Sequence, residues 1–369
     1  MTRTLLRVAV ALLVVMAGAV GAIAPGAAMA ETNTQDLQCE FPATFEDGGG
    51  EEVQLDEQPD EIVTLNPSAA QTMWEIGAEE RVTGLSQHAM YLEGADDRTD
   101  ITNEEGTTSV EQVIELEPDL VLAPNTIPEE TVEQLRTEGD LTVYHFETAT
   151  SIDDVRDKTQ LIGQLVGECE GAEETVSWMD EELSNVEAAI EGEDRPSVYL
   201  EFHAFTAGSS TFQDEVLTTA GGENAAAEAG IEGWGQMSQE QLVEQNPDWL
   251  IIPEGSAMPE GEGIESSTAM QEDNVIEVTE EHMQQPAPRV VYAVSEINEA
   301  LYAESDEGAI DDEETNGETT DDTTTEEEST DDETASDDAV DDAEPDALPG
   351  FGIAAALAAL LSVVALRHR

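Results

Sequence analysis

The stretch Ile62-Val63-Thr64-Leu65-Asn66-Pro67-Ser68 decides the fold, because a short apolar run passes directly into residues that start a helix. Four residues rich in β-branched side chains, ended by Asn66-Pro67, predict a buried strand. Ser68 is then expected to cap a helix that runs to Gly77. The first unit of the body is therefore a strand followed by a helix.

The same unit repeats along the chain. In the first half we expect further strands at 81–85, 119–123 and 141–146, and helices at 110–116 and 128–138. Alternation at this spacing predicts a parallel sheet with right-handed crossovers. The pattern resumes later, with strands at 197–202, 248–253 and 274–278 and helices at 212–220, 238–245 and 288–302.

Two long helical segments separate these halves. The first is 152–166, and the second is 172–190, with apolar residues at helical spacing and a break expected around Gly167 and Gly171. The chain is therefore predicted to be an α/β protein with two α/β lobes bridged by one long helix. The expected boundaries are 31–171 for the first lobe, 172–192 for the connecting helix and 193–303 for the second lobe.

The N-terminus has the features of an export signal. Arg3 and Arg7 precede an apolar run at 8–20, and Ala28-Met29-Ala30 forms a cleavage site, so residues 1–30 are predicted to be a signal peptide. The alternative is a retained membrane anchor, for which the run is short. Either interpretation places the body outside the cytoplasm.

Composition predicts an acidic spacer and a salty environment. Residues 304–346 contain 22 Asp or Glu and no Lys, Arg or aromatic residue, which predicts a disordered stalk at 304–347. The whole chain has 86 acidic residues against 11 Lys plus Arg, and Lys158 is its only lysine. Such acidity is typical of a protein from a halophilic archaeon, and it excludes nucleic acid as a partner.

The C-terminus carries a short apolar segment, 353–366, between Pro349-Gly350-Phe351 and the basic residues Arg367 and Arg369. Its 14 residues are fewer than the roughly 20 that span a bilayer. Residues 348–369 resemble the PGF-CTERM sorting signal of archaeal surface proteins. This resemblance implies removal by an archaeosortase, after which a lipid anchors the protein at the extracellular face of the membrane.

Two cysteines, Cys39 and Cys169, are present. An even number in an exported chain predicts a disulfide, with two free thiols as the alternative. The residues at 35–38 are mostly polar and lie far from the apolar run at 8–20, which excludes Cys39 as a lipidated N-terminal cysteine.

Five segments, in order, resemble the periplasmic binding proteins for cobalamin and ferric siderophores, and together they span about residues 51–303. They are RVTGLS at 81–86 after NPS, VIELEPDLV at 113–121, FTAG at 205–208 leading to AGGENA at 220–225, WGQMSQEQL at 234–242 and PAPRVV at 286–291. The resemblance implies the class III fold, in which two α/β lobes are bridged by a rigid helix, here at about 172–190. Ligand is then expected in the cleft between the lobes, on loops at strand ends.

Seven residues in such loops are the predicted ligand contacts. They are His88, Tyr91, Asn125, His203, Phe205, Trp234 and His282. Aromatic faces suit a flat corrin or a catecholate, and in the resembling family Trp234 matches a tryptophan that faces the ligand. The alternative for each is a packing or rim residue, and Arg289 is expected to anchor the closing helix.

The family also implies docking to an ABC permease, with its ATPase, through one glutamate on each lobe. Glu240 matches the second-lobe position. The first-lobe position falls on Gln71, which departs from the pattern, so Glu75 is the expected substitute.

The sequence therefore predicts a monomeric, extracellular solute-binding lipoprotein that captures a metal chelate and has no resident cofactor. Bare zinc, manganese or iron is the alternative cargo, although no His-rich loop is present. No G-x-S-x-G, H-E-x-x-H or Walker pattern supports an enzyme, and no internal repeat supports an adhesin. Corrinoid, ferric siderophore and haem all remain open.

Overall fold

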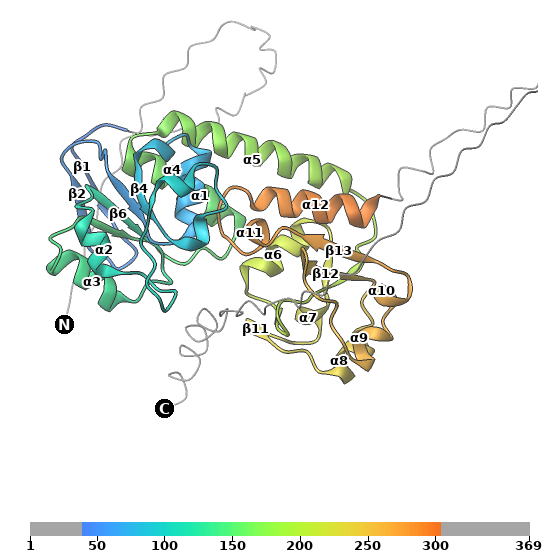
Figure 1. Cartoon of the computed structure of the whole chain (residues 1–369). Helices are drawn as coiled ribbons and strands as arrows, with labels where there is room; N and C mark the ends of the chain where they lie inside the picture. The colour runs from blue at the N-terminus through green and yellow to red at the C-terminus, as the bar shows by residue number, and fades with distance from the viewer. Residues whose placement is uncertain (1–38, 304–369) are drawn as a thin grey trace, which may run out of the picture. The chain divides into compact units, whose positions relative to one another are not determined.

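The computed structural model describes residues 39–303 (Figure 1). The predicted signal peptide, stalk and sorting motif at Pro349, Gly350 and Phe351 lie outside the described residues. Two parallel sheets form the centre of the two lobes. The fold is therefore the predicted α/β arrangement.

The first lobe is built on a five-stranded sheet in the order β5-β4-β3-β6-β7. All its neighbouring strands are parallel. The strands are β3 (Ile62–Thr64), β4 (Val82–Leu85), β5 (Thr99–Asp100), β6 (Leu120–Ala123) and β7 (Val143–His145). An antiparallel hairpin of β1 (Ala43–Glu46) and β2 (Glu52–Leu55) precedes it.

Both faces of this sheet are buried, which explains its continuous apolar strands. Ile62 packs with α1 (Pro67–Glu75) on one face, whereas Val63 packs with α2 (Val110–Glu115) and α3 (Glu129–Thr137) on the other. Successive strand residues point to opposite faces, so each strand serves two cores.

The start of α1 corrects one expectation. Asn66, and not Ser68, is the N-cap, because its side chain accepts a hydrogen bond from the backbone N–H of Ala69 at 3.1 Å. Pro67 occupies the first helical position, where its fixed φ suits the helix and its missing N–H leaves no bond unmade. Ser68 is buried inside the first turn.

The second lobe has a four-stranded sheet in the order β10-β8-β12-β13, again parallel. Its strands are β8 (Ser197–Leu200), β10 (Glu223–Asn224), β12 (Trp249–Pro253) and β13 (Val275–Val278), and the small antiparallel pair beside it is β9 (Thr206–Ala207) with β11 (Trp234–Gly235). Its helices are α6 (Phe212–Thr219), α7 (Ala225–Glu228), α8 (Gln239–Gln245), α9 (Glu262–Glu265), α10 (Thr268–Gln271), α11 (Glu280–Met283) and α12 (Val290–Tyr302).

Long helices connect the two cores. On α5 (Cys169–Ala189), Ala172 belongs to the first core and Met179 to the second, so this helix runs between the lobes as predicted. On α4 (Ile152–Val166), Ile152 packs in the second core and Ile162 in the first. The connection is thus a helical hairpin, and α12 packs beside α5 (Figure 1).

The expected helix break at Gly171 is wrong, because α5 begins at Cys169 and continues through this glycine. A Cβ at Gly171 would overlap the carbonyl oxygen of Ile76 at the end of α1. The glycine therefore permits close approach of two helices. Gly167, by contrast, does end α4, in the left-handed conformation that glycine favours.

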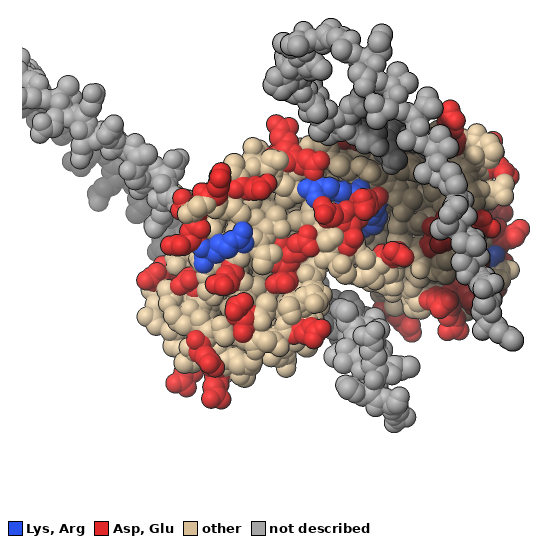
Figure 2. Space-filling model, turned by 180° about the vertical axis from the view of Figure 1, so that it is seen from behind, with Lys and Arg blue, Asp and Glu red and all other residues tan. Residues whose placement is uncertain are grey.

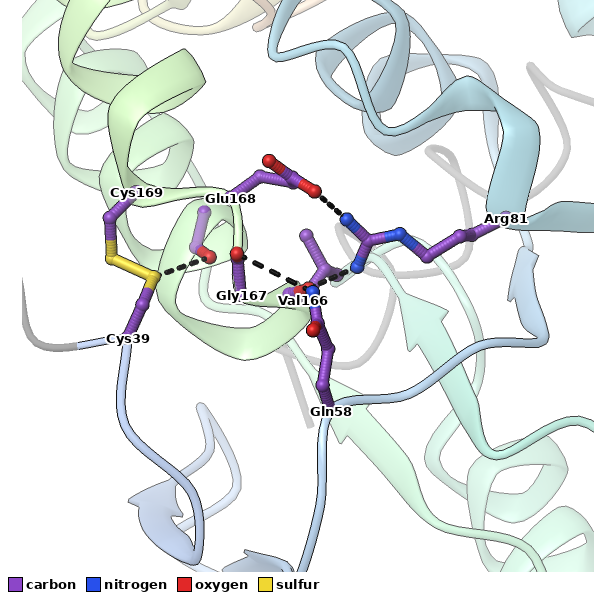
Figure 3. Close-up of a disulfide and its surroundings, with 8 residues drawn as sticks. Cys39, Gln58, Arg81, Val166, Gly167, Glu168 and Cys169 are labelled. Carbon is purple, nitrogen blue, oxygen red and sulfur yellow. Dashed lines mark hydrogen bonds and ion pairs between the residues drawn. A yellow bond between two sulfur atoms is a disulfide. The ribbon is translucent and has the colours of Figure 1, made fainter.

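A disulfide between Cys39 and Cys169 joins the N-terminal segment to the start of α5, with Cα atoms 6.0 Å apart (Figure 3). The predicted pairing is confirmed. Beside it, the Val166 carbonyl at the end of α4 accepts hydrogen bonds from Gln58 Nε2 at 3.0 Å and from Arg81. Arg81 also pairs with Glu168. A cation at a helix C-terminus is favourable, so this corner fixes the hairpin to the first lobe.

Acidic side chains are spread over the back of the molecule, with few basic ones between them (Figure 2). Residues 39–303 contain seven Lys or Arg, and four of them pair with carboxylates: Arg81, Arg136, Arg156 and Arg289. Within the same residues, no helix is both long and apolar enough to cross a membrane.

Candidate functional site

A cavity of about 160 Å³ lies between the two lobes. Residues that follow β3, β6 and β7 line it from the first lobe, and Gln284, Gln285 and Pro286, which follow β13 and α11, line it from the second. The carboxyl ends of three strands of the first sheet therefore form one wall of the cavity, and the segment between α11 and α12 forms the other. Open α/β sheets bind ligands at this edge, which makes the cavity the candidate site.

Asn125 is the predicted ligand contact that lines this cavity directly, because it follows β6 and is exposed. Asn66 and Ser68 at the start of α1 line it as well, and so does Lys158 on α4. Lys158 Nζ donates hydrogen bonds to the Pro286 carbonyl and, at 3.3 Å, to Ser68 Oγ. The one lysine of the chain therefore links both lobes at the site.

Tyr91 lies where the lobes meet, after the carboxyl end of β4. Its hydroxyl accepts a hydrogen bond from Gln71 Nε2 at 2.9 Å and donates one to Gln285 Oε1 at 3.4 Å. Burial raises the pKa of Tyr91 and keeps the hydroxyl protonated. His88, on the short helix Gln87–Ala89 nearby, is exposed.

Arg289 anchors the start of α12 to the first lobe, as expected. Its backbone N–H donates to Gln71 Oε1 at 2.9 Å, and its Nε donates to Glu75 Oε1 at 2.7 Å. Gln71 is fully buried, and the Glu75 side chain is 20% exposed. Both first-lobe positions considered for docking thus take part in contacts between the lobes. Glu240, on α8, is exposed.

An aromatic group lies on the second lobe around the turn that follows β8. The Phe202 ring lies 4.6 Å from the His203 ring and 5.8 Å from the Trp234 ring. Phe202 and Phe205 exchange backbone hydrogen bonds of 2.8 and 2.9 Å across a tight turn. The structure therefore places the His203 and Trp234 rings against Phe202, with Phe205 across the turn from it.

The turn between these phenylalanines is strained. His203 and Ala204 have φ of 51° and 67°, a conformation that non-glycine residues rarely adopt. The Ala204 N–H donates to Glu201 Oε1 at 2.6 Å, and Gln236 Nε2 donates to the Ala204 carbonyl at 3.2 Å. These bonds hold His203 exposed at the tip of the turn.

His282 contacts the closing helix α12. Its ring is 5.3 Å from the Tyr292 ring, and its Nδ1 is 3.8 Å from Glu296 Oε1, both on α12. Burial, followed by the charge of Arg289, lowers its pKa. The structure thus places this imidazole against the closing helix. In residues 39–303, no group of three or more His, Cys, Asp or Glu side chains is arranged to hold a metal ion.

Several residues of the site carried no motif. Lys158 and Gln285 are 127 positions apart in the sequence and come together only in the folded chain. The one available signal was composition, because a single lysine in so acidic a chain is unusual.

The fold and the inter-lobe cavity define a solute-binding protein with two α/β lobes. Residues 62–297 match the family model described as periplasmic binding protein, and the chain belongs to this family. A cobalamin-binding protein of Halobacterium salinarum is 38% identical over 309 residues, covering 80% of this chain and 83% of that protein. The family and this relative are binding proteins and not enzymes.

Solved structures share the fold. The periplasmic heme-binding protein RhuT of Roseiflexus sp. RS-1 superposes with a TM-score of 0.60 and 24% identity, over 66% of this chain and 98% of that one. The periplasmic vitamin B12 binding protein BtuF of Vibrio cholerae gives 0.58 and 20%, over 67% and 98%. At the C-terminus, residues 348–369 match the PGF-CTERM motif, as predicted.

Proposed function

We propose that this protein captures a corrinoid between its lobes and delivers it to an ABC permease with its ATPase. The observation that carries the proposal is the 38% identity, over 80% of the chain, to a protein named as cobalamin-binding. Other metal chelates, such as a ferric siderophore or haem, are the competing cargoes within the same fold.

The geometry supports a bulky, partly flat ligand. Trp234, His203 and Phe205 lie on the second lobe, and Tyr91 and Asn125 lie on the first. His203, Phe205, Tyr91 and Asn125 follow the carboxyl ends of parallel strands, whereas Trp234 lies on the antiparallel strand β11. Aromatic rings give a planar ligand a large contact area at small loss of side-chain entropy. Bare metal is disfavoured, because residues 39–303 hold no group of three potential ligands.

Delivery would use the exposed surface of the second lobe around Glu240, where a carboxylate is free to meet a cationic permease. Glu75 would first have to leave Arg289 to serve the same purpose. The PGF-CTERM motif supports processing by an archaeosortase and attachment to a lipid at the extracellular face of the membrane.

The test is titration calorimetry on the full chain in molar KCl, with cyanocobalamin, a ferric catecholate, haem and zinc as separate ligands. We expect tight binding of cyanocobalamin. If the protein binds haem or the ferric catecholate but not cyanocobalamin, its cargo is that chelate and not a corrinoid. Binding of zinc alone would refute the proposal.

A further inference from the structure

Lys158 has an unusual electrostatic setting. It is the only lysine in a chain of net charge −75, yet it forms no ion pair with any carboxylate of residues 39–303. Its hydrogen-bond partners are the neutral Pro286 carbonyl and the Ser68 hydroxyl. An ammonium group carries three N–H donors, so one remains for a further acceptor.

The cavity around this ammonium is otherwise almost neutral. Its polar lining consists mainly of the amides of Asn66, Asn125, Gln284 and Gln285, and the acidic residue of the lining, Glu147, is exposed. The N-terminal end of α1 also opens here, and its first turn contains no acidic residue. The partial positive charge of a helix N-terminus therefore adds to that of Lys158.

This arrangement lacks a counter-ion. Burial lowers the pKa of Lys158 to about 8, and no carboxylate of residues 39–303 pairs with its ammonium group. A cation in such a place is stabilised most by an anion that approaches its free N–H. The cavity opens between the lobes, so that anion can belong to the ligand.

We propose that Lys158, beside the N-terminal end of α1, binds an oxyanion of the ligand, which in a corrinoid is the phosphate of the nucleotide loop. This inference rests on the proposed function. It adds an assignment of which part of the ligand contacts which group of residues. The aromatic group after β8 would face the ring system, while Lys158 would hold the phosphate at the floor of the cleft.

The experiment compares cobinamide phosphate with cobinamide, which differ in the phosphate alone. Binding to the full chain is measured by calorimetry in molar KCl for the wild type, Lys158→Met and Lys158→Arg, with Lys158→Gln as a second neutral variant. We expect the wild type to prefer the phosphate form by about 10- to 100-fold, the range of a charged hydrogen bond. Both neutral variants should lose this preference, and Lys158→Arg should keep part of it.

Each outcome separates the two proposals. Equal binding of both ligands by the wild type, or an undiminished preference in the neutral variants, overturns the role of Lys158 and leaves corrinoid capture intact. If the wild type binds neither cobinamide phosphate, nor cobinamide, nor cyanocobalamin, the role of Lys158 and the proposed corrinoid capture are both refuted. A role of Lys158 in lobe packing alone would weaken both ligands equally, and would therefore also overturn the inference.

Discussion

Replacing both Cys39 and Cys169 with serine should lower the free energy of unfolding by removing a cross-link between residues 130 positions apart. In the chain-entropy model, a loop of this size lowers the entropy of the unfolded state enough to stabilise the fold by about 5 kcal/mol. Residual structure in the reduced unfolded chain makes the measured loss smaller, so we expect about 2–5 kcal/mol.

The double variant avoids a single unpaired thiol, and urea unfolding in molar KCl measures the difference. The denaturant dependence should also rise, because the unfolded chain without its cross-link exposes more surface. Wild-type protein unfolded with a reducing agent should reproduce the variant. Arg81→Met is the matched control, because it removes contacts at the same corner without opening the loop. A loss below about 1 kcal/mol with an unchanged denaturant dependence would refute the entropic argument.

The remaining predictions concern the cleft. Glu75→Gln and Arg289→Met should show a coupling of about 1 kcal/mol in a double-mutant cycle of unfolding, because their side chains meet at 2.7 Å; additive effects would contradict the anchor. Trp234→Ala should weaken cyanocobalamin by about 1 kcal/mol or more, measured by calorimetry against His282→Ala as control; unchanged affinity would remove Trp234 from the site. Because the pKa of Lys158 falls to about 8 from 10.5 on folding, the unfolded chain binds more protons between these values, so this group makes stability rise with pH there. The difference in free energy of unfolding between the wild type and Lys158→Met, measured at several pH values, isolates that rise. A difference that does not change with pH would contradict the prediction.

Local sequence patterns were sufficient for the alternation of elements. The strands at 62–65 and 119–123 were predictable because both faces of the first sheet are buried, which leaves continuous apolar runs. The errors were local. Asn66 replaced Ser68 as the cap, and Gly171 lies within a helix because packing against Ile76 requires a residue without a Cβ.

The residues of the candidate site also differ in whether local sequence patterns could place them. His203 and Phe205 could be placed at one edge of the sheet from the sequence, because they follow β8 and strand direction fixes that edge, whereas Trp234 was placed by the family resemblance and lies on the antiparallel strand β11. His282 shows the limit of this argument, since a helix intervenes after β13 and turns the side chain toward α12. The role of Glu75 was hidden because its partner, Arg289, is 214 positions away.

The sequence by itself determined the alternation of strands and helices, the acidic composition and the sorting motif, because these depend on composition and on patterns within a few residues. The match to the PGF-CTERM motif confirms the last of them. Tertiary structure alone decided which polar groups meet in the cleft. Lys158, Ser68 and Pro286 come from three distant segments, and their hydrogen bonds exist only because the folded helical hairpin brings the two lobes together.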